Sequence, residues 1–137
     1  MNRTDFQKLT DLRLNEAKVL LDAKCYEGAY YLMGYAVECA LKACIATQTK
    51  EYDFPDKNSG KLYIHDLNIL LKFSGLEEKH SKNSELNPGF GDNWNIVKDW
   101  KEDVRYSLEI TKDKAEASYL ALVDGKDGIM PWLQKWW

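Results

Sequence analysis

Two charged residues stand in the most apolar stretch of the chain, and they are the first candidates for chemistry. Glu38 and Lys42 lie in Glu27–Gln48, where every other residue from Gly28 to Thr47 is apolar, aromatic, small or hydroxyl-bearing. Because the lysine follows the glutamate by four positions, the two charges share one face of a helix in the favourable order. A carboxylate in such a helix costs on the order of several kcal/mol unless a cation and hydrogen bonds meet it. We therefore expect Glu38 to have a further partner from elsewhere in the chain.

Arginine is rare in this sequence, so its positions are informative. Lysine is abundant, whereas arginine occurs only at Arg3, Arg13 and Arg105. Arg13 falls within the apolar arc of the first predicted helix, so it either lies at the edge of that arc and reaches water or pairs with Glu38. Arg105 stands beside Tyr106, and its planar guanidinium suits a carboxylate or a phosphate. Two interpretations stay open, an interior Arg13–Glu38–Arg105 network that fixes helix register, or the same cluster bordering a groove that binds phosphate or an RNA backbone.

Histidine and cysteine supply the other reactive side chains. His65 stands beside Asp66 at the start of a predicted helix, where a capping or packing role competes with a catalytic one. The three cysteines are Cys25, Cys39 and Cys44, and the last two point to different sides of one helix. This spacing favours neither a disulfide nor a shared metal, so we expect no metal and no other cofactor.

Composition limits the classes of partner. The 137 residues, 45% of them hydrophobic and 30% charged, fit one globular domain spanning residues 1–137. The net charge of -3 gives no general attraction to nucleic acid or to anionic membranes, so an RNA contact requires a local patch. Glu27–Gln48 is long enough to span a bilayer, but its two central charges argue against a membrane protein. Reduced cysteines and an N-terminus without an apolar signal core indicate the cytoplasm.

Helices are the elements that must position these residues. The capping-box spacing of Thr4–Gln7 predicts a helix that starts there and runs to about Ala23. The connection Cys25–Gly28 is so short that the second helix, Glu27–Gln48, should run antiparallel to the first. A long loop around Pro55 follows, and it is the segment for which we expect disorder.

The second half of the chain predicts shorter elements and no strand. These are a helix from His65 to Leu71 closed by Gly75, a loose helix at best over 76–86, a turn at Asn87–Gly91, a helix capped by Asp92 or Asn93 that carries Trp94, Val97 and Trp100, and a last helix from about Thr111 that Pro131 kinks or restarts. Trp132, Trp136 and Trp137 end the chain, and we expect them to be core or dimer-contact aromatics. The apolar character of this end predicts a homodimer. The chain is predicted to be one all-helical bundle.

The run from Tyr30 to Ala43 resembles the second-helix signature of HEPN domains, the higher-eukaryote and prokaryote nucleotide-binding family. Three further stretches are similar to this family in the same order, and they are Arg13-x-x-x-Ala17, His65-Asp66-Leu67, and Trp100 followed by Val104-Arg105-Tyr106. The resemblance spans nearly the whole chain. It implies a four- or five-helix up-and-down bundle, usually a homodimer, often encoded beside a minimal nucleotidyltransferase in a toxin–antitoxin or related pair.

The resemblance also bears on catalysis. Ribonuclease members of the family carry an arginine followed four to six residues later by histidine. Arg105 is the positional equivalent here, but the residues after it, from Tyr106 to Lys112, include no histidine. The general acid/base of a ribonuclease is therefore absent at that spacing.

Three functions follow from these observations. The first is a non-catalytic module that binds a nucleotide, RNA or a nucleotidyltransferase partner. Its candidate residues are Arg13, Glu38, Lys42, Arg105 and Tyr106. The second is a metal-independent endoribonuclease that uses Arg105 with a non-standard base, with His65 as a candidate. The third is a purely structural helical dimer, in which Arg13 and Arg105 are both paired in the interior.

Overall fold

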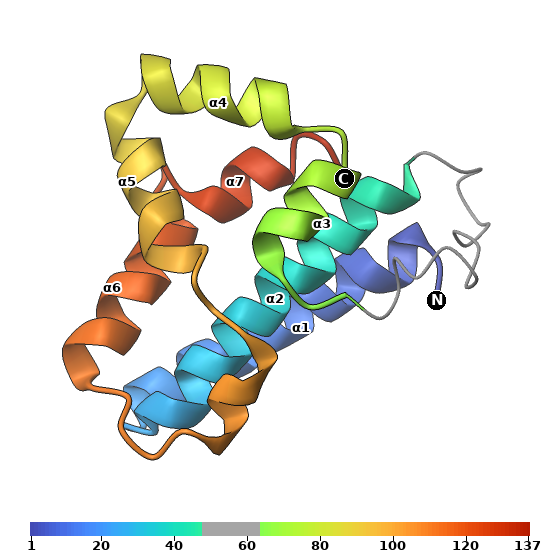
Figure 1. The fold of residues 1–137 in the computed structure, drawn as a ribbon. Helices are drawn as coiled ribbons and strands as arrows, with labels where there is room; N and C mark the ends of the chain where they lie inside the picture. The colour runs from blue at the N-terminus through green and yellow to red at the C-terminus, as the bar shows by residue number, and fades with distance from the viewer. Residues whose placement is uncertain (48–63) are drawn as a thin grey trace.

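An antiparallel pair of long helices forms the centre of the fold. The computed structural model describes residues 1–47 and 64–137, and its first two helices are α1 (Arg3–Asp22) and α2 (Tyr26–Ala46). The pair lies side by side along most of its length (Figure 1). Lys24 makes the sharp reversal between them, with a φ of 64°. The predicted antiparallel pairing is confirmed, but the connection is residues 23–25 and not the predicted Cys25–Gly28, because α2 already begins at Tyr26.

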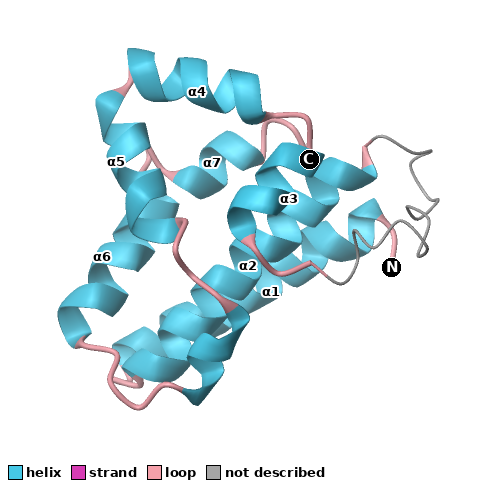
Figure 2. Cartoon of the chain, viewed as in Figure 1, coloured by secondary structure: helices cyan, strands magenta, loops and turns pink. Residues whose placement is uncertain are grey.

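Shorter helices cover one side of this pair. They are α3 (Leu67–Phe73), α4 (Glu77–Leu86), α5 (Pro88–Val97), the 3-10 helix η2 (Glu102–Tyr106), α6 (Lys112–Val123) and α7 (Ile129–Leu133). The described part of the chain contains no strand, so the all-helical prediction is confirmed (Figure 2). It also contains more helices than the four or five expected. The long loop predicted around Pro55 lies outside the described residues.

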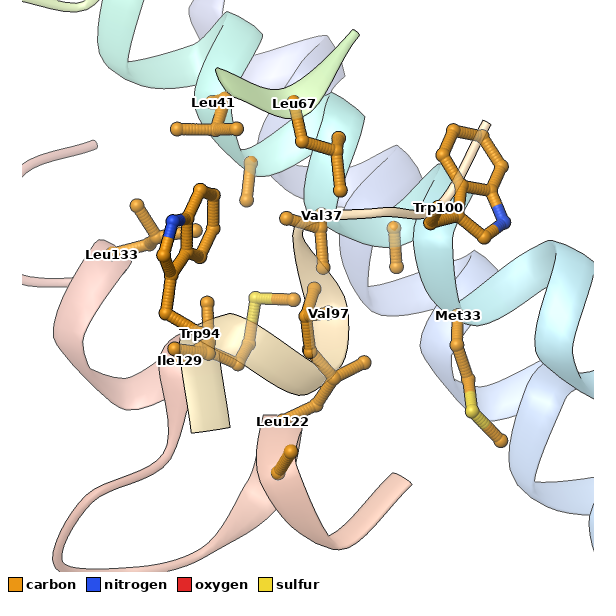
Figure 3. Close-up of a cluster of buried hydrophobic side chains, with 14 of the residues drawn as sticks. Met33, Val37, Leu41, Leu67, Trp94, Val97, Trp100, Leu122, Ile129 and Leu133 are labelled. Atoms are coloured by element: carbon orange, nitrogen blue, oxygen red, sulfur yellow. The ribbon is translucent and has the colours of Figure 1, made fainter. Parts of the chain in front are cut away.

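The second helix is buried on most of its faces, as its composition predicts. It contacts α1, α3, η2, α6 and α7. Its apolar side chains Val37 and Leu41 meet Leu67 of α3 and Leu133 of α7 in the main core (Figure 3). In the described residues no helix combines the length and the apolar composition that a membrane crossing needs. Because α2 is surrounded in this way, a polar group on its buried faces must find its partners inside the protein.

Helix starts differ from the sequence prediction at two places. The capping box of α1 is formed by Asn2 and Asp5, with reciprocal bonds of 2.9 and 3.0 Å, and not by the predicted Thr4–Gln7. The turn predicted at Asn87–Gly91 is also wrong, because α5 begins at Pro88. Proline suits the first helical position, where its missing N–H has no partner to lose. The neighbouring α4 is a regular helix, although only a loose one was expected.

The C-terminal tryptophans pack against their own chain. Trp132 is buried, while Trp136 and Trp137 are half-buried against core clusters. Their prediction as core aromatics is confirmed for Trp132. The apolar end of the chain is therefore not the exposed surface from which a homodimer was predicted. A homodimer stays a prediction, and its physical reason must come from another surface.

The second histidine, His80, sits in an aromatic cage. Its ring lies 5.1 Å from Phe90, 4.8 Å from Trp94 and 5.6 Å from Trp132, centroid to centroid. The buried Nε2 has no hydrogen-bond partner within residues 1–47 and 64–137. Burial lowers the pKa of His80 to about 4.

This histidine predicts a loss of stability in acid. The unfolded chain binds the proton near pH 6.5, whereas the folded protein binds it only near pH 4. The stability that neutral His80 supplies is thus complete above about pH 6.5 and falls by up to about 3 kcal/mol as the pH drops to 4. Urea unfolding from pH 4 to 7 should show a shallower pH dependence for His80→Gln than for the wild type. Parallel pH curves for the two proteins would contradict the prediction.

Candidate functional site

Glu38 is the buried centre of the site. Only 2% of this residue is exposed, and its Oε1 receives two contacts. Lys42 Nζ, one turn further along α2, donates to it over 2.8 Å, and His65 Nδ1 lies 2.9 Å away. The other oxygen, Oε2, has no hydrogen-bond partner in the described part of the chain. The expectation that Glu38 pairs with Lys42 and with a residue from elsewhere is confirmed, and that residue is His65.

His65 extends this contact to the protein surface. Its Nε2 lies 3.0 Å from Oε2 of Glu102, the first residue of η2. The side chains of His65 and Glu102 are 34% and 43% exposed, so the chain of contacts runs from the interior to solvent. Asp66 caps α3 by accepting from the N–H groups of Asn68 and Ile69. Asp66 therefore caps α3, and His65 does not serve as the cap.

The predicted interior network of two arginines and Glu38 is wrong. Arg13 Nη1 pairs with Glu16 Oε1 at 2.6 Å, three residues along the same helix. The Arg13 guanidinium also lies 6.0 Å from the centre of the Tyr35 ring. The arginine therefore stays at the edge of α1 and reaches water, because a local partner and an aromatic face satisfy it there. The space around Glu38 is taken by Lys42 and His65 instead.

Arg105 is exposed at the surface of η2. Its guanidinium carbon lies 4.9 Å from the centre of the Tyr106 ring, and Tyr106 is 74% exposed. Hydrogen bonds to Tyr106 and then to Tyr31 raise the pKa of Arg105. Among the described residues no carboxylate forms an ion pair with it. We call Arg105, Tyr106 and Tyr31 the Arg105 surface.

A buried tryptophan docks η2 and the Arg105 surface onto α2. Trp100, two residues before η2, packs on Gly34 of α2, where a Cβ would overlap the indole ring. The ring also stacks on Tyr31 at 6.1 Å and 27°. Figure 3 shows Trp100 against α2, apart from the Trp94 side of the core. The glycine is therefore required for the close approach that positions Arg105.

The groove beside His65 is acidic. His65, Asp66, Lys101, Glu102 and Asp103 line an open hollow of about 360 Å³. Three carboxylates against one lysine make this hollow unfavourable for a phosphate. A phosphate on η2 must therefore meet Arg105 outside the hollow.

A second open groove of about 420 Å³ lies between the end of α1 and α6. Three lysines line it, but two of them are already paired. Lys18 Nζ lies 2.7 Å from Asp22, and Lys112 Nζ lies 3.8 Å from Glu116. The positive charge of this groove is thus largely balanced within the protein.

Nucleophilic and metal chemistry find little support in the described residues. Burial raises the pKa of the Cys39 and Cys44 thiols to about 12, so neither is a thiolate at neutral pH. Cys25 is exposed, and all three cysteines are free thiols. No cluster of histidine, cysteine and carboxylate side chains within residues 1–47 and 64–137 has the arrangement of a metal site.

Sequence reasoning missed Glu102 and Tyr31. Glu102 precedes Arg105 by three positions, which a 3-10 helix places on one face, but the sequence does not predict a 3-10 helix there. Tyr31 is one of several tyrosines on α2, and only the tertiary packing distinguishes it from the others as a neighbour of Arg105. Comparison with protein-family models, with curated proteins and with solved structures finds no match for the chain.

Proposed function

We propose that this chain is a HEPN-like helical binding module whose Arg105 surface holds a phosphate of a nucleotide or of single-stranded RNA. The observation that carries the proposal is the exposed guanidinium of Arg105, which lies against tyrosines with no described carboxylate paired to it. Such a fork binds two phosphate oxygens at once. The exposed ring of Tyr106 offers a face on which a base can stack.

The same surface argues against a purely structural role. That role predicts both arginines paired in the interior, whereas Arg105 is exposed. Beside it in the chain, Tyr106 and Leu108 are 74% and 88% exposed, so they add apolar contact area to this face. Tyrosine and arginine are also the residue types that dominate protein interfaces. A nucleotidyltransferase partner or a second copy of the chain at this surface is part of the proposal.

The test is the affinity for single-stranded RNA. We expect fluorescence anisotropy with a 5′-fluorescein-labelled oligouridylate to detect weak binding that falls with salt, with a slope of about 0.7 per phosphate contacted. Arg105→Ala should weaken it about tenfold, because one charge-assisted bidentate contact is lost. Lys126→Ala, which removes one positive charge in the turn between α6 and α7, is the matched control and should have no effect. Equal loss in both variants, or no binding by the wild type, would contradict the proposal.

One observation favours an endoribonuclease as the second candidate. His65 has the buried Glu38 behind its Nδ1, and its Nε2 touches Glu102 on the same 3-10 turn as Arg105. Tertiary structure thus brings a histidine close to the helix that carries the arginine. In this structure, however, both ring nitrogens contact carboxylates, so neither faces a substrate hydroxyl. Rapid RNA cleavage by the wild type, abolished in both Arg105→Ala and His65→Ala, would establish the enzyme in place of the module.

A further inference from the structure

His65 has a carboxylate at each ring nitrogen. Oε1 of Glu38 lies 2.9 Å from Nδ1, and Oε2 of Glu102 lies 3.0 Å from Nε2. An ionised carboxylate only accepts hydrogen bonds, and a neutral imidazole has only one N–H to donate. The imidazolium form alone can therefore donate to both carboxylates. A neutral ring leaves one lone pair facing a carboxylate oxygen at hydrogen-bond distance.

The charged groups around His65 come from three elements. They are Glu38 and Lys42 on α2, Asp66 at the start of α3, and Lys101, Glu102 and Asp103 at the start of η2. Four carboxylates and two ammonium groups leave this neighbourhood with an excess of negative charge. The proton that lets His65 donate to both carboxylates also reduces that excess.

We infer that protonated His65 is a positioning residue that ties η2 to α2 and so controls how the Arg105 surface is presented. The inference rests on the proposed function, because it concerns the regulation of the same surface. Glu38 is enclosed by the core, whereas Glu102 is partly exposed. When the proton leaves, the contact opens at Glu102, since water can solvate this carboxylate and cannot reach Glu38. The start of η2 then loses its contact with His65, while Trp100, two residues before η2, still packs on α2.

Replacing Glu102 by glutamine should allow the hydrogen bond between residue 102 and His65 to form whether or not His65 is protonated. The amide of Glu102→Gln can donate to Nε2 of a neutral ring whose Nδ1–H donates to Glu38. This variant should keep the tie at every pH, whereas His65→Ala should lack it at every pH. Asp103→Asn is the matched control, because it removes the neighbouring carboxylate, for which the structure records no contact with His65.

The first experiment needs no ligand. Proton–nitrogen correlation spectra of ¹⁵N-labelled protein from pH 5.5 to 8.5 should show the amides of 102–106 shifting in the wild type and in Asp103→Asn. Glu102→Gln should hold the low-pH positions throughout. The other histidine, His80, has its pKa lowered to about 4 by burial, so it does not change charge in this range. Equal shifts in the wild type and in Glu102→Gln would overturn the inference.

The second experiment asks whether the tie controls binding. Affinity for the labelled oligouridylate should fall about tenfold from pH 6 to 8.5 in the wild type and remain level in Glu102→Gln. If the RNA affinity of both proteins is independent of pH while the amide shifts are present, the protonation of His65 does not control the Arg105 surface. If no protein binds the RNA at any pH, the proposed function fails, and the spectra alone decide whether His65 ties η2.

Discussion

Replacing Glu38 by alanine is expected to lower the free energy of unfolding by about 3–5 kcal/mol. The carboxylate contacts Lys42 Nζ at 2.8 Å and His65 Nδ1 at 2.9 Å in the interior. Without it, the nearly buried ammonium of Lys42 loses an ion-pair partner that helps to offset its removal from water. The cost is therefore that of breaking a buried charge pair and exceeds the value of a typical surface ion pair.

Urea unfolding at pH 7 measures this effect. Glu27→Ala, which removes a carboxylate from the first turn of the same helix, is the matched control and should change stability by less than about 1 kcal/mol. The loss of stability in Glu38→Gln should lie between those of Glu38→Ala and Glu27→Ala, because the amide oxygen still accepts a hydrogen bond from Lys42. A midpoint that is unchanged in Glu38→Ala would show that the buried pair adds nothing to stability.

Gly34→Ala is expected to destabilise the protein by about 3–5 kcal/mol. The added methyl would overlap the Trp100 ring, which is buried against α2. Trp100 is attached to a short segment that packs closely on α2, so the ring must leave its site or the helices must separate. Either change gives up much of the area that the tryptophan buries and moves the Arg105 surface.

Thermal and urea unfolding of four variants test this contact, namely Gly34→Ala, Trp100→Leu, the two changes combined, and a control. Gly125→Ala is the matched control, because a Cβ there meets no atom within 4 Å. Combining Gly34→Ala with Trp100→Leu should cost less than the sum of the two single changes, since the smaller side chain makes room for the methyl. Strict additivity, or a stable Gly34→Ala protein with unchanged fluorescence, would contradict the prediction.

Local sequence determined the two long helices and the requirement that Glu38 have a distant partner. The apolar run from Gly28 to Thr47 is long enough to predict a helix buried on most faces, and the spacing of Glu38 and Lys42 places both charges on one face. Such conclusions hold because helix periodicity and the cost of a buried charge depend on residues within a few turns. The need of Glu38 for a distant partner therefore follows from the amino-acid sequence alone.

Only the tertiary structure decided which partner that is. His65 lies 27 residues from Glu38 along the chain, and its position just before α3 places it beside the carboxylate. Arg13 suits a carboxylate equally well, yet it pairs with Glu16 on its own helix. Several cations could satisfy the charge, and the choice among them depends on how α1, α3 and η2 pack on α2. The location of Arg105 at the surface follows from the same packing, since the fit of Trp100 on Gly34 fixes where η2 lies.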